Sequence, residues 1–242
     1  MGEVSERQAP PKARAGRSDG TVALLTIVSA VSIVEFCLGQ SAGRDWVTRA
    51  LGGSIQDISH GQVWRLLTPA LVNPPIEAAQ SGMASRVGIA VHFLPNVVLL
   101  WIFGTRLEAR LGTARLLTVA VASEFFGRAW LAVPFPRYDG HGGGTSIMLS
   151  GVAGALFMLV WSERHDGQNQ RRKLWLSAGL FALALITAPG LAAGHNHAHG
   201  AGFVAGAAIG YGARRQRFRE AVVVVVVVAA AIVVLRVAQL RA

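Results

Sequence analysis

Long apolar stretches recur along this chain, and short polar segments rich in arginine separate them. There are seven such stretches, at residues 21–38, 87–103, 116–133, 145–161, 174–193, 196–211 and 221–240. A helix needs about 17 to 25 residues to cross a bilayer, and several of the stretches are near the lower limit. We therefore predict seven membrane-spanning helices, the shorter ones enclosed by their neighbours.

The composition supports this fold class. Hydrophobic residues make up 52% of the 242 residues, charged residues only 15%, and the mean hydropathy is +0.44. These values predict an all-α, polytopic membrane helical bundle. We divide the chain into a disordered basic cytoplasmic tail (1–20), a membrane core (21–212), and a basic loop with a C-terminal transmembrane helix (213–242). The single cysteine, Cys37, excludes an intrachain disulfide framework and a cysteine-rich zinc site.

The net charge of +10 raises the question of nucleic-acid binding, but the basic residues lie in clusters between apolar stretches. Such a distribution is typical of membrane topology, so we predict no nucleic-acid partner. The clusters are Arg106, Arg110 and Arg115; Arg164, Arg171, Arg172 and Lys173; and Arg214, Arg215, Arg217 and Arg219. By the positive-inside rule they face the cytoplasm together with the N-terminus, which predicts a multi-pass cell-membrane protein.

Two reactive side chains lie near the predicted outer ends of their helices. Ser150 lies about five residues into the stretch that begins at residue 145, and His199 about three residues into the stretch that begins at residue 196. At roughly 1.5 Å per residue they would lie at similar depths. An unsatisfied hydroxyl is costly in a membrane, and a histidine can take its proton. We therefore predict that Ser150 and His199 form a catalytic pair.

Small residues accompany both side chains. Gly202 and Gly206 follow His199 at helical spacing, and Gly151 and Gly154 follow Ser150 in the same way. Glycines at this spacing let membrane helices approach until their backbones nearly touch. We predict close helix packing at the site.

A third polar group lies on the second apolar stretch. His92 and Asn96 are four residues apart, so they share one helix face near its predicted outer end. There they could donate hydrogen bonds to a developing oxyanion.

Together these residues resemble the rhomboid family of intramembrane serine proteases. Five ordered motifs carry the resemblance, over about residues 61–210. They are Gly61-Gln62-Val63-Trp64-Arg65 (the first-loop Trp-Arg motif), His92 with Asn96 (His-x-x-x-Asn), Gly104 with Glu108 and Gly112 (Gly-x-x-x-Glu-x-x-x-Gly), Leu149-Ser150-Gly151 (the serine motif), and Ala198-His199 with Gly202 and Gly206 (the histidine motif).

The resemblance implies a six-helix core plus a C-terminal seventh helix. It also implies a Ser150–His199 dyad without a third carboxylate, and an oxyanion hole of His92, Asn96 and the Ser150 backbone N–H. The reaction implied is hydrolysis of peptide bonds in or near transmembrane segments of membrane-protein substrates, without a cofactor or metal. The active site would open to the extracytoplasmic side.

The sequence departs from the family pattern in three places. Met148 stands at the first position of Gly-x-Ser-Gly, Pro95 precedes Asn96, and Glu124 occupies a mid-helix position where the family favours small residues, with Arg128 as its expected partner. A second hypothesis is therefore a catalytically inactive rhomboid-like protein that binds membrane clients. A third is a metal site at His195, His197 and His199, but His197 points away from the other two, and the Glu of a His-Glu-x-x-His site is missing.

Overall fold

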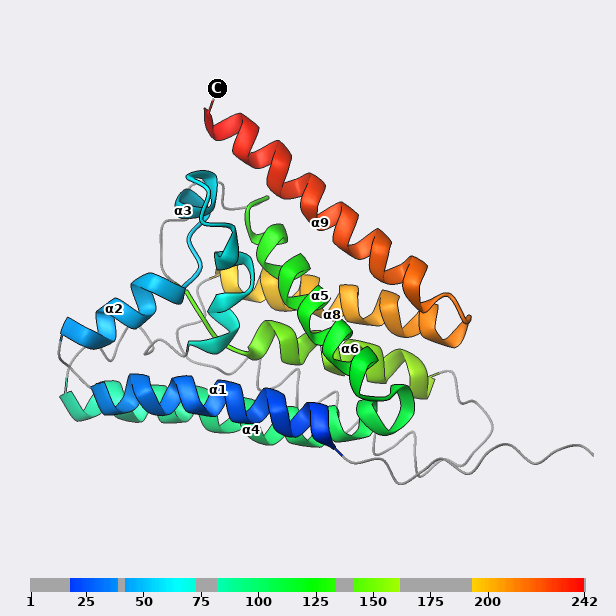
Figure 1. Ribbon diagram of the computed structural model, residues 1–242, viewed down its shortest axis with the longest axis horizontal. Coiled ribbons are helices and arrows are strands. Elements are labelled where there is room, and N and C mark those ends of the chain that lie inside the picture. The colour runs from blue at the N-terminus through cyan, green and yellow to red at the C-terminus, as the bar shows by residue number, and fades with distance from the viewer. Residues whose placement is uncertain (1–17, 39–41, 73–81, 134–141, 162–192, 242) are drawn as a thin grey trace, which may run out of the picture.

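The described part of the chain is built almost entirely from helices (Figure 1). The computed structural model describes residues 18–38, 42–72, 82–133, 142–161 and 193–241. Its elements are α1 (Asp19–Leu38), α2 (Ala42–Leu51), α3 (Ile55–Ser59), the 3-10 helices η1 (Val63–Leu66) and η2 (Thr68–Leu71), α4 (Gly82–Leu111), α5 (Thr113–Leu131), α6 (Ser146–Trp161), α8 (Ala193–Arg214) and α9 (Phe218–Arg241).

Six of the seven predicted apolar stretches coincide with α1, α4, α5, α6, α8 and α9. The fifth stretch, residues 174–193, lies almost wholly outside the described residues, as does most of the predicted tail. Two described helices, α1 and α9, are long and apolar enough to cross a membrane, and α6 is apolar but shorter. The all-helical prediction is confirmed for the described residues, while the number of spans stays a prediction.

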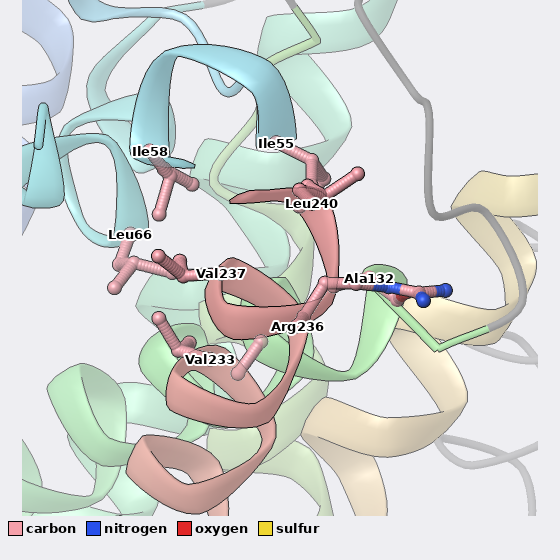
Figure 2. A pocket seen from close by; sticks show the side chains of 9 residues that line it. Ile55, Ile58, Leu66, Ala132, Val233, Arg236, Val237 and Leu240 are labelled. Carbon is pink, nitrogen blue, oxygen red and sulfur yellow. The ribbon is translucent and has the colours of Figure 1, made fainter. Parts of the chain in front are cut away.

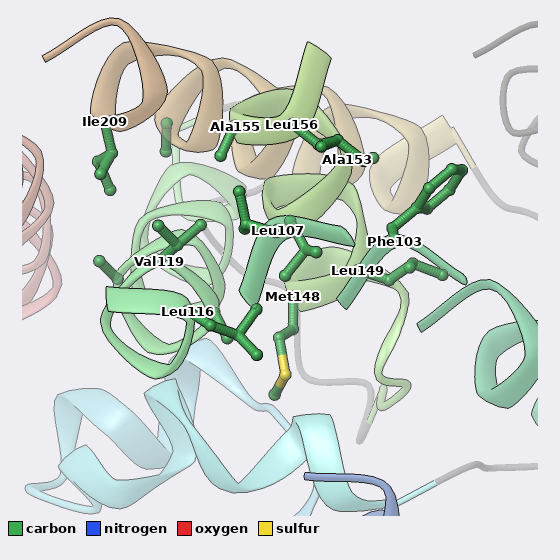
Figure 3. Close-up of a cluster of buried hydrophobic side chains, with 14 of the residues drawn as sticks. Phe103, Leu107, Leu116, Val119, Met148, Leu149, Ala153, Ala155, Leu156 and Ile209 are labelled. Atoms are coloured by element: carbon green, nitrogen blue, oxygen red, sulfur yellow. The ribbon is translucent and has the colours of Figure 1, made fainter. Parts of the chain in front are cut away.

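The core lies where α4, α5, α6 and α8 meet. Figure 3 shows side chains from all four helices in one cluster, among them Leu107, Leu116, Met148, Leu149 and Ile209. Because α5 and α6 pass through the centre of this cluster, the start of α6 is held by packing on several sides.

Glu108 holds α1 against the turn between α4 and α5. Its carboxylate accepts hydrogen bonds from the backbone N–H groups of Gly20 and Thr21 at 2.8 and 2.9 Å, and from the hydroxyls of Thr21 and Thr113 at 2.7 and 2.6 Å. The N–H groups at the start of a helix have no partner within it, so this carboxylate caps α1. Gly112 closes the turn with φ of 82°, a conformation that favours glycine.

The C-terminal helix α9 packs against α3 and the end of α5 (Figure 2). Arg236 donates to the carbonyls of Ala132 and Val133 at 2.9 and 3.3 Å, and Arg241 donates to the carbonyl of Ser59 at 2.7 Å. Both arginines thus satisfy carbonyls at helix C-termini, where cations are favourable. The guanidinium of Arg236 thereby ties α9 to the end of α5.

We predict that Glu108→Ala lowers the free energy of unfolding by about 2–4 kcal/mol, because hydrogen bonds to a charged group contribute about 1.5–3 kcal/mol and several N–H groups lose their acceptor. Equilibrium unfolding in detergent micelles measures the change. Glu108→Gln, which keeps one acceptor oxygen, should lose less. An unchanged unfolding midpoint for the alanine variant would contradict this role.

The same carboxylate predicts a pH dependence. Burial alone would raise the pKa of Glu108, but hydrogen bonds from Thr113, Thr21 and the backbone N–H groups of Gly20 and Thr21 outweigh burial and hold that pKa below its ordinary value. A lowered pKa means that the stabilisation is fully present above the unfolded pKa of about 4.3 and is lost as the pH falls through the folded value. Glu108→Gln should flatten this acid limb of the stability curve.

Candidate active site

A serine and a histidine meet where α6 and α8 begin. Ser146 is the first residue of α6, and its Oγ lies 2.7 Å from Nε2 of His199 on α8. Both residues are buried, His199 with only 5% of its surface exposed. A hydroxyl and an imidazole at hydrogen-bond distance form the pair that nucleophilic catalysis requires.

Glycines fix how α6 and α8 pack. A Cβ added to Gly202 would lie 2.8 Å from the carbonyl oxygen of Ile147, and one added to Gly210 would lie 2.6 Å from that of Ala155. Gly206 approaches the carbonyl of Gly151 still more closely. In each pair the two residues are 55 positions apart (202 and 147, 206 and 151, 210 and 155), so the helices run parallel at constant register.

This register corrects our prediction for the serine. The structure does not pair Ser150 with His199: the Ser150 hydroxyl donates to the carbonyl of Ser146 at 2.7 Å, within its own helix. Subtracting the same 55 positions from 199 gives 144, which places His199 beside the segment that leads into α6, next to Ser146. Ser150 therefore lies one helical turn too deep.

The sequence did contain a signal for Ser146. Gly144-Thr145-Ser146 has the Gly-x-Ser order of the rhomboid serine motif, whereas Ser150 has Met148 at the glycine position. Gly144 adopts φ of 131°, which favours glycine, and an added Cβ there would meet the His92 ring. If Ser146 is the motif serine, Gly144 matches the first glycine of Gly-x-Ser-Gly. The residue that differs from the motif is then Ile147, at its fourth position, and not Met148.

Ile147 is accommodated by glycines on the two neighbouring helices. A Cβ added to Gly127 of α5 would collide with Ile147 Cγ2, and one added to Gly202 of α8 would lie 3.0 Å from it. A Cβ on Gly127 would also lie 2.8 Å from the carbonyl oxygen of Ala198, the residue before His199. Three helices therefore approach one another at the level of the Ser146–His199 pair.

His92 lies on the other side of this centre. A Cβ added to Gly144 would lie 3.0 Å from His92 Nε2 and 3.3 Å from Ser146 Oγ. The imidazole of His92 and the hydroxyl of Ser146 thus both lie close to Gly144. Asn96 is buried, and its side-chain amide donates to the His92 carbonyl at 3.0 Å, so this amide is tied to its own helix.

The first loop supports the segment that leads into α6. The Gly53 N–H donates to the Gly142 carbonyl at 2.7 Å, and the Gly144 N–H donates to the Pro69 carbonyl at 2.8 Å. The Thr145 hydroxyl donates to the carbonyl of Ala70 at 2.9 Å. Residues 142–145 are therefore held on the loop immediately before Ser146.

Arg65, the arginine of the Trp-Arg motif, organises this loop from inside. Its guanidinium donates to Gln62 Oε1 at 2.7 Å and to the carbonyls of Gly52 and Arg49, and it lies 3.4 Å from Asp57. The neighbouring Trp64 is half exposed. The arginine of the motif is thus a structural centre, and its tryptophan faces outward.

The metal hypothesis stays untested, because the described residues do not include the His195 side chain. They contain no group of three His, Cys, Asp or Glu side chains that could hold a metal ion. His197 is exposed, His199 is buried, and the side chain of His195 lies outside the described set.

The described part of the chain is thus a bundle of helices with a serine hydroxyl and an imidazole at hydrogen-bond distance near one end. The family model of the rhomboid domain matches residues 80–216, which is more than half of the chain. The chain belongs to the rhomboid family.

The chain is also similar to individual rhomboid proteins. It is 26% identical over 209 residues to the rhomboid protease GlpG of Yersinia pestis (strain Pestoides F), covering 82% of this chain and 64% of the relative. It is 28% identical over 199 residues to the rhomboid protease GlpG of Serratia proteamaculans (strain 568), covering 78% and 62%. The chain therefore spans a little under two thirds of the length of these relatives.

We predict that Gly206→Ala weakens the α6–α8 contact, because its Cβ would collide with the Gly151 carbonyl. Overpacking of this kind costs about 1–3 kcal/mol, which equilibrium unfolding measures. Gly200→Ala is the matched control: Gly200 is an exposed glycine on the same helix, and no described atom lies within 4 Å of its added Cβ. Equal stabilities for the two variants would show that the contact does not require glycine.

Proposed function

We propose that the chain is a serine endopeptidase of the rhomboid family, with Ser146 as the nucleophile and His199 as its general base. The observation that carries the proposal is the 2.7 Å contact between Ser146 Oγ and His199 Nε2. Ser146 thereby replaces Ser150, our candidate from the sequence, whose hydroxyl bonds within its own helix.

The chemistry follows from this contact. His199 Nε2 takes the hydroxyl proton as Ser146 Oγ bonds to the carbonyl carbon of the substrate peptide. The C–N bond then breaks, and His199 returns the proton to the leaving amine, which yields an ester on Ser146. His199 then takes a proton from water as the water oxygen bonds to the ester carbon. The bond between this carbon and Ser146 Oγ breaks, the carboxylic acid leaves, and His199 returns the proton to Ser146 Oγ.

His92 is the best candidate to stabilise the oxyanion. Its Nε2 and Ser146 Oγ both lie close to Gly144, and an N–H in that position can donate to the developing negative charge. Asn96 supports His92 through the hydrogen bond to its carbonyl. Its second amide hydrogen remains a candidate donor.

We propose that the site opens to the extracytoplasmic side of the membrane. The centre lies where α6 and α8 begin, whereas Arg106, Arg110 and Arg115 cluster around the α4–α5 turn and Arg214 ends α8. Because basic clusters favour the cytoplasm, the opposite end of the bundle faces outward. Transmembrane segments of other proteins are then the proposed substrates.

Ile147 is the observation that favours the alternative, a rhomboid-like protein that binds clients without cleaving them. A bulky side chain there could hold the first turn of α6 away from a catalytic geometry. The packing of Ile147 against Gly127 and Gly202 argues against this, since Ser146 still reaches His199.

A fluorophosphonate probe tests the nucleophile. We expect the purified full chain to be labelled and Ser146→Ala to give only background. The matched Ser150→Ala variant should keep its labelling within about fivefold, since one neutral hydrogen bond contributes about 1 kcal/mol. Labelling that survives in Ser146→Ala but is lost in Ser150→Ala would restore the assignment made from sequence. Client binding without labelling of the unsubstituted chain would favour the inactive alternative.

We further predict that His92→Ala lowers kcat for a transmembrane peptide substrate by about 10²–10³, the usual effect of removing one oxyanion donor. KM should change much less, because the donor acts mainly in the transition state. Asn96→Ala should lower kcat less, since the side-chain amide of Asn96 donates to the backbone carbonyl of His92. A larger loss of kcat in Asn96→Ala than in His92→Ala would make Asn96 the main oxyanion donor.

A further inference from the structure

A buried ion pair on α5 reaches across to the helix that carries Ser146. Glu124 and Arg128 are 1% and 5% exposed, and Arg128 Nε donates to Glu124 Oε1 at 2.8 Å. The other carboxylate oxygen, Oε2, accepts the backbone N–H of Met148 at 3.0 Å. The pair that the sequence suggested therefore has a third member on α6.

Met148 is the third residue of α6, so its N–H belongs to the first turn, where no carbonyl of the helix can accept it. In a buried, water-poor site an N–H without an acceptor costs several kcal/mol. A carboxylate is the best acceptor here, because the helix dipole also favours a negative charge at this end. Glu124 thus caps the turn that begins with Ser146.

Arg128 orients the carboxylate and lies close to Gly53 of the first loop. Its Nη1 would lie 3.5 Å from a Cβ on Gly53, the residue whose N–H donates to Gly142. A lone carboxylate would be costly to bury, and the adjacent guanidinium removes that cost.

We propose that Glu124 is a positioning residue for Ser146: its side-chain oxygen fixes the first turn of α6 by accepting the Met148 N–H, and Arg128 serves to balance the charge of the buried carboxylate. This inference rests on the proposed function. Ser146 lies two residues before Met148, and its hydroxyl has to stay within hydrogen-bond reach of His199. A displacement of about 1 Å at a reacting atom can cost about 10²-fold in rate.

We expect that the charge itself is not required for folding. Buried ion pairs replaced by apolar residues of similar volume often leave stability unchanged or raise it, whereas removing one partner alone is strongly destabilising. The test therefore replaces both charges together. It compares two neutral pairs that differ in a single property, the acceptor for the Met148 N–H.

The two variants are Glu124→Gln with Arg128→Met, whose amide oxygen can still accept the Met148 N–H, and Glu124→Leu with Arg128→Met, which has no acceptor. Both are purified as full chains, and their unfolding midpoints in detergent are measured. The rate of fluorophosphonate labelling is then compared, together with kcat and KM for a transmembrane peptide.

We expect the Gln–Met variant to label within about threefold of the unsubstituted chain, and the Leu–Met variant to label about 10- to 100-fold more slowly, mainly through kcat. Equal labelling of two folded variants, whether both are fast or both are slow, would overturn the proposal.

Hydrogen–deuterium exchange of the Met148 amide provides a readout that does not depend on catalysis. The Leu–Met variant should exchange this amide faster than the Gln–Met variant, even in a Ser146→Ala background. Equal exchange would overturn the proposal. If exchange differs as expected while the unsubstituted chain is never labelled, the capping is upheld and the proposed protease function fails.

Discussion

The site depends on the parallel contact between α6 and α8. Three glycines of α8 each meet a backbone carbonyl of α6, and all three pairs have the same separation along the chain. Backbone contacts of this kind cannot slide gradually, because a shift of one residue would place side chains against the opposite backbone. The depth at which His199 meets α6 is therefore set by residues 202–210, well below the reactive pair.

The other elements act on the first turn of α6. On one side α5 contributes Gly127, which admits the Ile147 side chain, and Glu124, which caps the Met148 N–H. On the other side the first loop binds Gly142, Gly144 and Thr145. Ser146 thus has little freedom of its own. Precise placement of this kind lets a weak nucleophile work with a single base.

Much of the fold was predictable from the sequence, because apolar runs and glycine spacing are local patterns. The face of α8 that carries Gly202 and Gly206 does pack against α6. The serine in contact with His199 is Ser146 and not Ser150, a difference of one helical turn, and element boundaries from sequence are uncertain by ~2 to 4 residues. The register comes from contacts 55 residues apart, and Glu124 meets its backbone partner 24 residues away. No local pattern encodes such pairings.

Ile147, which stands where the family motif has its second glycine, is compensated by glycines on the neighbouring helices. An isoleucine after the serine would be incompatible with close packing if its neighbours carried side chains. Here Gly127 and Gly202 leave the space that its Cγ2 occupies, so the volume is redistributed among three helices. The buried carboxylate of Glu124 is compensated as well. One of its oxygens accepts a hydrogen bond from Arg128 and the other from the buried N–H of Met148. Both departures are compensated within the same turn, which is why Ser146 and His199 can still meet at hydrogen-bond distance.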